Sequence, residues 1–344
     1  MKLHLDKDVF KQFINKISSE TNISVDILEK DYYVCCILQE LAKKQAELQA
    51  YFKGGTAIYK ILDTMNRFSE DIDLTVKVNE QLSNNQKKKF FERTAFDYNV
   101  EGLTLNEAKS IKNGKSETAF FDYETVFDID TAPLQRAGEI QIESTSFTVS
   151  EPIEDAVIEP IIYKYASDSE KKTLKENFDV EPIKIKIIKL ERMFIDKVFA
   201  AEFYYTRKEY TDTAKHIYDL CVLINNDKIK ELFKNEQELK RLVGYKREEE
   251  KIKTLRELTT DEFNKTGIED LFRQIMSISR KYQYKVLGSE TNELLPFKQV
   301  DKLDVDKDTR IVCFGEHGAY TEQAMEEVFG TDITSMNRLS FKEV

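Results

Sequence analysis

The stretch YFKGGTAIYKILDTMNRFSEDIDLTVKV, residues 51–78, places two glycines and a threonine after a short apolar run, and two aspartates further along. Residues 56–62 repeat apolar side chains at helical spacing, whereas the last eight residues alternate strictly between polar and apolar. The stretch therefore predicts a strand, a helix, a loop and a second strand. Residues two apart on a strand point to the same face, so we expect Asp71 and Asp73 to project side by side.

This pair of carboxylates has two interpretations. Two close carboxylates repel each other unless a cation lies between them, and Mg²⁺ prefers carboxylate oxygen. The preceding GGT sequence offers a backbone that can approach a phosphate closely and helix N-terminal amides that can bind it. On the residues alone, a site for Mg²⁺ and a nucleotide and the solvent face of an edge strand both remain open.

Length and composition limit the classes of protein to consider. The 344 residues are 41% hydrophobic and can form two or three folded domains. No apolar run is long enough for a membrane span, and the charged N-terminus does not resemble a secretion signal, so we expect a cytoplasmic protein with no membrane partner. The net charge of -11 disfavours a surface that coats nucleic acid, so any RNA contact should be focal.

The remaining pattern predicts an α+β fold for the first two-thirds of the chain. Helical spacing runs through residues 5–50, and strands are expected at 119–129, 139–147 and 183–188. After about residue 244 the chain reads as helical. A linker at 291–308 and a new strand and helix in 309–344 follow.

Several motifs together resemble a known family. KGGTAIYKI followed by RFSEDIDL, with LEKDYYVCCIL upstream, is similar to the AbiEii/AbiGii toxin nucleotidyltransferases of the DNA polymerase β-like superfamily. IQIES, LERMFIDKVFAAEF and TAKHIYDL agree with that family in the same order. The resemblance implies a nucleotidyltransferase domain at 1–245, with a polymerase β-like core and helical flanks. It also implies Mg²⁺-dependent transfer of a nucleoside monophosphate from an NTP to an RNA, with tRNA as the first candidate, and a cognate antitoxin.

The resemblance also implies roles for individual residues. The implied nucleotide-binding residues are Gly54, Gly55, Thr56, Arg67 and Ser69, and the implied catalytic residues are Asp71, Asp73, Glu143, Lys197 and Asp219. Asp71 and Asp73 would bind the metal. Glu143 would be a third metal ligand or the base for the attacking hydroxyl, with an exposed strand residue as the alternative. Lys197 would reach the triphosphate, unless it is a surface lysine, and Asp219 would orient Lys197 or the nucleotide.

Two other polar features are expected to be structural. Glu29, Lys30 and Asp31 are interpreted mainly as an internal ion-pair network. His216 has no metal-ligating companion nearby in the sequence, which disfavours a histidine-based hydrolase.

The rest of the chain resembles other enzymes. Residues 246–290 are similar to the second half of an AroQ-type chorismate mutase, and Arg247, Glu248, Ser279 and Gln283 match its binding positions. The first helix of that enzyme, with its dicarboxylate-clamping basic groups, is missing. Residues 309–344 resemble the opening of a prephenate dehydratase without its later Thr-Arg-Phe motif. The chain thus resembles a chimera joined near YKREEE, in which neither of these two activities is expected.

Three functions follow from these observations. The first is an Mg²⁺-dependent nucleotidyltransferase toxin with an inert tail. The second is a chorismate- or prephenate-binding protein of phenylalanine biosynthesis, and the missing basic clamp counts against it. The third is a non-catalytic module that only holds nucleotide or RNA, which the set of Asp71, Asp73 and Lys197 disfavours.

Overall fold

The computed structural model divides the chain into two compact units, Met1–Arg273 and Gln274–Val344. The described residues are 1–62, 67–79, 81–112, 116–127, 137–146, 150–257, 267–268, 271–272, 274–279, 281–282, 309–314, 320–330 and 334–338. In this part of the chain every helix is too short or too polar to span a lipid bilayer.

A mixed β-sheet forms the centre of the first unit. Its strands are β1 (Ala50–Lys53), β2 (Ile72–Val76), β3 (Leu103–Leu105), β4 (Ile111–Lys112), β5 (Ser116–Tyr123), β6 (Glu139–Thr145), β7 (Ile153–Ile158) and β8 (Ile183–Ile188). The order is β3-β5-β6-β2-β1-β8-β7, and β4 pairs with β5. The central strand β2 is antiparallel to β1 and parallel to β6.

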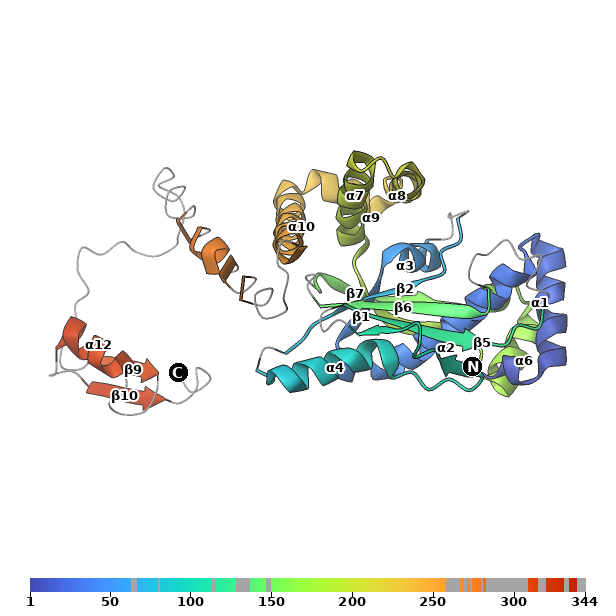
Figure 1. Ribbon diagram of the computed structural model, residues 1–344, viewed down its shortest axis with the longest axis horizontal. Helices are drawn as coiled ribbons and strands as arrows, with labels where there is room; N and C mark the ends of the chain where they lie inside the picture. Colours follow the sequence, from blue (N-terminus) through green and yellow to red (C-terminus); the bar gives the residue numbers. More distant parts are fainter. Residues whose placement is uncertain are drawn as a thin grey trace. The chain divides into compact units, whose positions relative to one another are not determined.

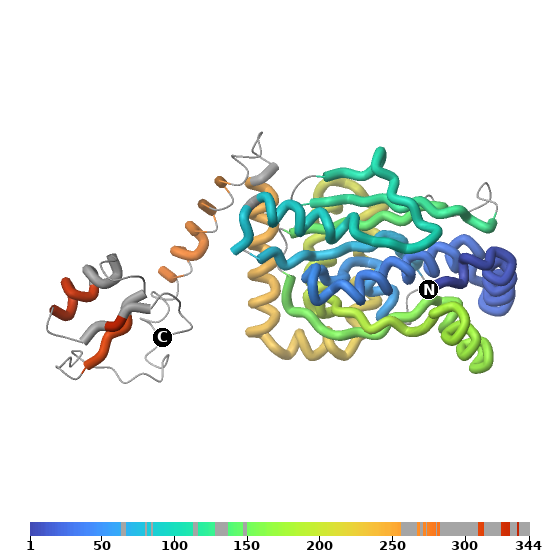
Figure 2. Tube along the Cα trace, turned by 90° about the horizontal axis from the view of Figure 1, so that it is seen from below, coloured from blue at the N-terminus to red at the C-terminus, as the bar shows by residue number. Residues whose placement is uncertain are grey.

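Helices cover both faces of this sheet. They are α1 (Lys7–Thr21), α2 (Val25–Leu48), α3 (Gly54–Ile61), α4 (Asn84–Phe96), α5 (Ile161–Lys164), α6 (Asp168–Phe178), α7 (Leu190–Thr206), α8 (Tyr210–Leu223), α9 (Asp227–Lys234) and α10 (Glu236–Glu257), with a 3-10 turn at Leu3–Leu5. Figure 1 shows α2 and α4 on one side of the sheet and α3, α7 and α8 on the other. From below, α2 and α4 lie in front of the strands (Figure 2).

The alternation in β2 explains which side chains enter the core. Ile72 and Leu74 are fully buried, whereas Asp73 between them is only partly buried. Since β2 packs on α3, and the first residue of α3 lies against the Asp73 carboxylate, Asp73 faces the side of the sheet that carries α3. The pair Asp71 and Asp73 is therefore not the solvent face of an edge strand, because β2 lies between β1 and β6.

The predicted strands differ from the observed ones mainly at their ends. The strand expected at 119–129 is β5, which begins earlier and ends at Tyr123. Beyond this end, the backbone N–H of Val126 donates to the Glu29 carboxylate of α2 at 2.9 Å. The strand expected at 139–147 ends at Thr145. The short strands β3, β4 and β7 were not predicted.

The boundary expected after residue 245 falls within a helix. Helix α10 continues from Glu236 to Glu257 without a break, and Glu249 beyond the boundary accepts a hydrogen bond from Arg192 of α7 at 2.6 Å. Both side chains are buried. The first turns after residue 245 therefore pack with the preceding domain.

The second unit contains a parallel β-α-β arrangement. Strands β9 (Arg310–Phe314) and β10 (Thr334–Arg338) pair in parallel, and α12 (Tyr320–Phe329) lies between them in the sequence. The strand and helix were predicted, whereas β10 was not. The linker expected at 291–308 lies outside the described residues.

Candidate active site

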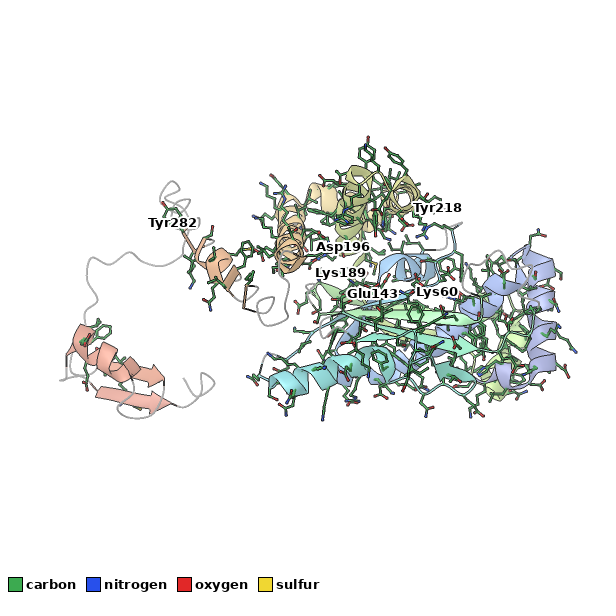
Figure 3. The ribbon with its side chains drawn as sticks, in the orientation of Figure 1. Lys60, Glu143, Lys189, Asp196, Tyr218 and Tyr282 are labelled. Atoms are coloured by element: carbon green, nitrogen blue, oxygen red, sulfur yellow. The ribbon has the colours of Figure 1, made fainter. Side chains whose placement is uncertain are left out.

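Three charged residues form a row across adjacent strands. The strand register places Asp73 of β2 opposite Glu143 of β6 on one side and opposite Lys53 of β1 on the other. Neighbouring strands of a sheet lie about 5 Å apart. The sheet therefore holds a second carboxylate and an ammonium group on either side of Asp73. Figure 3 labels Glu143 on the sheet, beneath the helical layer of α7 and α8 in that view.

Asp73 is the electrostatic centre of this row. The pKa of Asp73 is raised from 3.8 to about 6, mainly by burial. Glu143 and Asp71 also raise this pKa, whereas Lys53 and Lys197 lower it. Asp71, Glu143 and the two lysines thus all act on Asp73. Like-charged carboxylates held this near to one another favour protonation or a bound cation.

The donors fit Mg²⁺ better than a metal that needs a complete protein cage. Among the described residues, no group of three or more His, Cys, Asp or Glu side chains is already arranged around a metal position. Mg²⁺ commonly binds through one or two carboxylates and completes its shell with water and substrate phosphates. Asp71 and Asp73 provide such a pair, and burial, which raises the pKa of Asp73, disfavours its negative charge where no cation is bound.

Two glycines allow the start of α3 to approach this row. Gly54 has φ +82°, and a Cβ built there would lie 2.0 Å from Oδ2 of Asp73. A Cβ at Gly55 would lie 2.8 Å from Oγ of Ser69 and 3.0 Å from Nη2 of Arg67. A side chain at Gly54 would therefore be strained and would collide with Asp73, and one at Gly55 would displace Ser69 or Arg67. Lys53 is the N-cap residue of α3, and its side chain makes no capping hydrogen bond to the backbone amides of the first helical turn.

A buried aspartate holds two cations beside these glycines. Asp219 of α8 is fully buried and receives hydrogen bonds from Nε and Nη2 of Arg67 at 3.0–3.2 Å. The ammonium group of Lys197 on α7 lies 2.7 Å from Oδ2 of Asp219. Ser69 accepts a hydrogen bond from Thr56 at 3.0 Å. The α7–α8 hairpin thereby positions two cationic groups near the N-terminus of α3.

The structure thus brings together the residues that the sequence assigns to nucleotide and metal binding. Contacts, strand register or electrostatic interactions link all ten of them: Gly54, Gly55, Thr56, Arg67, Ser69, Asp71, Asp73, Glu143, Lys197 and Asp219. Their catalytic roles remain predictions.

The mutase-like residues have a different distribution. Arg247 is exposed and Glu248 partly buried on α10 of the first unit, whereas Ser279 is exposed in the second unit. Gln283 lies outside the described residues.

Lys53 was not predicted as a site residue. It immediately precedes the two glycines, and its Nζ donates to Oγ1 of Thr145 at 3.3 Å. Among the charged groups that act on Asp73, Lys53 has the largest effect on the pKa. Its position on the predicted strand could have indicated this role. Because side chains alternate along a strand, Lys53 points away from the face of Phe52 and lies next to the glycine turn.

The acidic-basic-acidic sequence at residues 29–31 contacts the chain segments that carry the site residues. Lys30 is buried, its ammonium group lies 3.3 Å from Glu70, and it also donates to the backbone carbonyl of Glu139. Glu70 directly precedes Asp71, and Glu139 begins β6, which carries Glu143. Lys30 therefore ties together the two chain segments that supply the carboxylates.

Its two neighbours bind other parts of the core. Asp31 forms an ion pair with Lys60 of α3 and accepts the backbone N–H of Ile161 at 2.8 Å. Glu29 accepts a hydrogen bond from the hydroxyl of Thr125. The expected internal ion-pair network is confirmed for Lys30 and Asp31, whereas Glu29 accepts hydrogen bonds from Thr125 and Val126. These contacts connect α2 to α3 and to the loops around the sheet.

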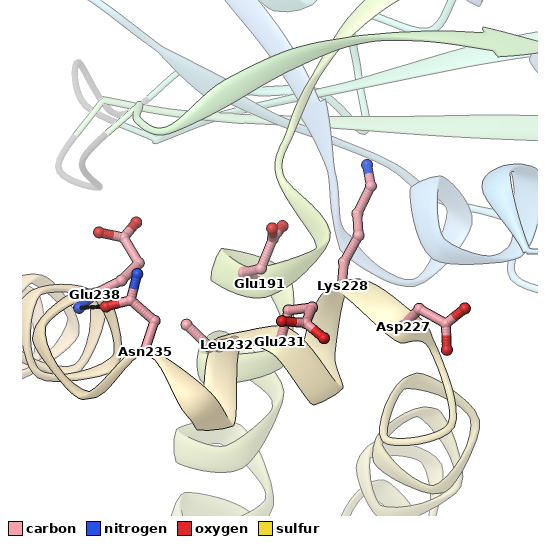
Figure 4. A pocket seen from close by; sticks show the side chains of 7 residues that line it. All are labelled: Glu191, Asp227, Lys228, Glu231, Leu232, Asn235 and Glu238. Atoms are coloured by element: carbon pink, nitrogen blue, oxygen red, sulfur yellow. Dashed lines mark hydrogen bonds between the residues drawn. The ribbon is translucent and has the colours of Figure 1, made fainter.

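A separate pocket of about 380 Å³ lies among α7, α9 and α10 (Figure 4). Its lining is largely acidic and consists of Glu191, Asp227, Lys228, Glu231, Leu232, Asn235 and Glu238. It contains none of the ten residues assigned above. We therefore do not place the nucleotide in this pocket.

Comparison with protein families identifies the domain. Residues 36–283 match the model of the nucleotidyl transferase AbiEii toxins, type IV toxin–antitoxin system. The chain belongs to the AbiEii family. It is therefore a member of a family of nucleotidyltransferase enzymes, as the sequence predicted. The AbiEii match extends through residue 283 and so includes most of the segment that resembles a chorismate mutase.

Solved structures include more distant similarities to this AbiEii protein. MenT4, a nucleotidyltransferase toxin from Mycobacterium tuberculosis H37Rv, is 14% identical with a TM-score of 0.34, over 55% of this chain and 57% of that chain. The chain thus spans somewhat more than half the length of MenT4. An antigenic nucleotidyltransferase-like protein from Paracoccidioides brasiliensis is 13% identical with a TM-score of 0.30, over 61% and 91%. No curated protein matches this chain. None of these comparisons supports the mutase-like and dehydratase-like resemblances, which remain predictions.

Proposed function

We propose that this protein transfers a nucleoside monophosphate from an NTP to a hydroxyl group of an RNA, with tRNA as the first candidate. The observation that carries the proposal is the row of Lys53, Asp73 and Glu143, which lies directly against the glycines that begin α3. Membership of the AbiEii family supports this activity, a toxin role and a cognate antitoxin. We infer a DNA polymerase β-like core in residues 1–245 and a cytoplasmic location, where NTPs and tRNA are abundant.

The triphosphate would bind at the N-terminus of α3. Backbone amides after Gly54 and Gly55 can donate to phosphate oxygens, and the helix dipole favours negative charge there. Arg67 and Lys197 add positive charge on the same side. Both are held by Asp219, which fixes their positions beside the glycines.

Asp71 and Asp73 would hold Mg²⁺. When bound, Mg²⁺ supplies charge neutralisation at the phosphates and lowers the pKa of the attacking hydroxyl. Lys53 limits the repulsion between the carboxylates by compensating part of the charge on Asp73.

Glu143 would accept the proton of the acceptor hydroxyl. The hydroxyl oxygen of the RNA then bonds to the α-phosphorus of the NTP. The bond between that phosphorus and the oxygen bridging the α- and β-phosphates breaks, and pyrophosphate leaves. Lys197 and Arg67 balance the charge that develops on pyrophosphate. Most of the acceleration would then come from positioning and fixed charge.

The test is incubation of the full chain with total tRNA, Mg²⁺ and each labelled NTP in turn. An Asp71→Asn, Asp73→Asn double variant removes the metal-binding charges, and Arg247→Ala, an exposed residue of α10, is the matched control. We expect label in RNA with the parent and with Arg247→Ala only. Binding of NTP without transfer by folded parent protein would instead favour the non-catalytic module. We infer that the mutase-like and dehydratase-like segments, 246–290 and 309–344, do not take part.

A further inference from the structure

The α7–α8 hairpin carries an aromatic pair that the mechanism above does not use. The rings of Tyr204 and His216 are stacked, with centroids 5.2 Å apart and planes inclined by only 15°. Both residues remain partly exposed, so a third planar group can extend the stack. Nδ1 of His216 has no hydrogen-bond partner among the described residues, so packing against Tyr204, and not a hydrogen bond at that nitrogen, orders the ring on this side.

The ring pair and the Lys197–Asp219 pair lie on the same two helices, α7 and α8, a short distance apart. His216 and Asp219 are one turn apart on α8, and Lys197 and Tyr204 are two turns apart on one face of α7. With a rise of 1.5 Å per residue, the stack is roughly 5–10 Å from the Lys197–Asp219 pair. This is the length scale of the ribose that separates a base from its phosphates.

Charged residues of the candidate active site also act on the two rings. Burial and the positive charge of Lys197 lower the pKa of His216 to about 4, while Asp219 and Asp212 oppose this effect. The His216 ring is therefore neutral near pH 7. Burial, and then the carboxylates of Asp212, Glu209 and Glu143, raise the pKa of Tyr204, with Lys215 acting in the opposite direction.

We propose that the stacked rings of Tyr204 and His216 bind the base of the NTP, an inference that rests on the proposed function. The rings offer a flat, neutral surface at the distance a base would reach from phosphates bound at α3. Stacking on an aromatic face tolerates every base, so this platform supplies affinity for the nucleoside and little discrimination among the four NTPs. The base of the RNA acceptor is the competing occupant.

Isothermal titration of the full chain with Mg-NTP in the absence of RNA tests the proposal. Tyr204→Ala removes the platform, and Tyr204→Phe keeps its ring. Tyr205→Ala is the matched control, because Tyr205 is the adjacent residue, 64% exposed, and packs against Tyr210 instead. Inorganic tripolyphosphate serves as a probe that has the phosphates and lacks the base. A thermal unfolding scan of each variant verifies that it is folded.

We expect Tyr204→Ala to weaken NTP binding about tenfold, the loss typical of one base-stacking aromatic, while Tyr204→Phe and Tyr205→Ala bind as the parent does. Tripolyphosphate should bind all four proteins equally. Equal NTP affinity of the parent and Tyr204→Ala would overturn the inference, as would an equal loss of tripolyphosphate affinity. An effect of Tyr204→Ala confined to the KM for tRNA would assign the rings to the acceptor. If the folded parent bound no NTP, the proposed function would fail together with the inference.

Discussion

Asp73 and Glu143 lie directly opposite each other in the register of β2 and β6. The backbone hydrogen bonds of the sheet, and not flexible side chains, therefore fix the separation between a candidate metal ligand and a candidate base. The two carboxylates also repel each other, which contributes to the raised pKa of Asp73. A protein that only needed stability would not keep this arrangement.

Asp73→Asn should raise the free energy of unfolding at pH 7 when divalent cations are removed. The folded-state pKa of Asp73, about 6, lies above its ordinary value of 3.8. The fold thus favours the neutral carboxyl, and stability is lost as the pH rises through this interval. Two pKa units correspond to about 3 kcal/mol, the upper limit for this partly exposed side chain. Denaturant titrations in EDTA measure the gain, which should vanish near pH 4.

The control for this substitution is Asp155→Asn, since Asp155 is an exposed carboxylate paired with Lys186 at the surface. It should not reproduce the gain. A stabilisation by Asp73→Asn that is the same at both pH values would contradict the account.

Gly54→Ala should abolish nucleotidyl transfer and destabilise the fold. Its Cβ would collide with the Asp73 carboxylate, and the left-handed conformation at φ +82° alone costs a non-glycine residue about 1–2 kcal/mol. Gly244→Ala is the matched control, because a Cβ at this position in α10 meets nothing within 4 Å. This change should stabilise the helix by up to about 1 kcal/mol. Unfolding and transfer assays on both variants test the contrast, and an active Gly54→Ala protein would refute it.

Lys30→Met should lower both stability and activity although Lys30 does not line the nucleotide site. The substitution leaves Glu70 and the Glu139 carbonyl without their buried cation, which typically costs about 3 kcal/mol. Lys7→Met removes the exposed Lys7–Glu124 pair and should cost less than about 1 kcal/mol. Denaturant titration compares the two. Equal, small losses would mean that Lys30 does not hold the site together.

Lys197→Met should reduce kcat/KM on the order of a hundredfold, because it removes one preorganised charge from the leaving pyrophosphate. Asp219→Asn keeps the shape of the buried side chain but loosens both Lys197 and Arg67, so it should also slow transfer. Lys215→Met removes an exposed lysine of α8 and should leave the rate unchanged. Steady-state kinetics with varied NTP concentration measure kcat/KM for each variant. A normal value for Lys197→Met would exclude a role of Lys197 in stabilising the leaving pyrophosphate.

The site residues between Gly54 and Asp73 could be predicted from the sequence, because they are close together in the chain and their pattern is local. The alternation around Asp71 and Asp73 and the glycines at 54–55 have few structural solutions, so a strand, a glycine turn and a helix followed directly. The relation of Asp73 to Glu143 depends on parallel pairing between β2 and β6, which periodicity does not specify. Only the resemblance to a family suggested it.

Other contributions depend on contacts distant in sequence. Lys30 and Glu70 are forty residues apart, and the sequence could suggest a buried ion pair but not its partner. Tyr204 and His216 meet because α7 and α8 pack against each other. His216 lies within the TAKHIYDL motif, but the motif does not indicate that its ring would stack on Tyr204. Beyond the end of β5, the backbone N–H of Val126 donates to the carboxylate of Glu29 on α2, a contact that the pattern of residues 119–129 does not reveal.

The most direct test of the central claim is to supply the preferred NTP with the label either on the α-phosphate or on the γ-phosphate. We expect the α-label to enter the 3′ end of the RNA, pyrophosphate to be released in equal amount, and the γ-label to stay out of the RNA. Transfer of the γ-label would show a kinase instead. Release of pyrophosphate with no α-label in RNA would contradict transfer to an RNA hydroxyl.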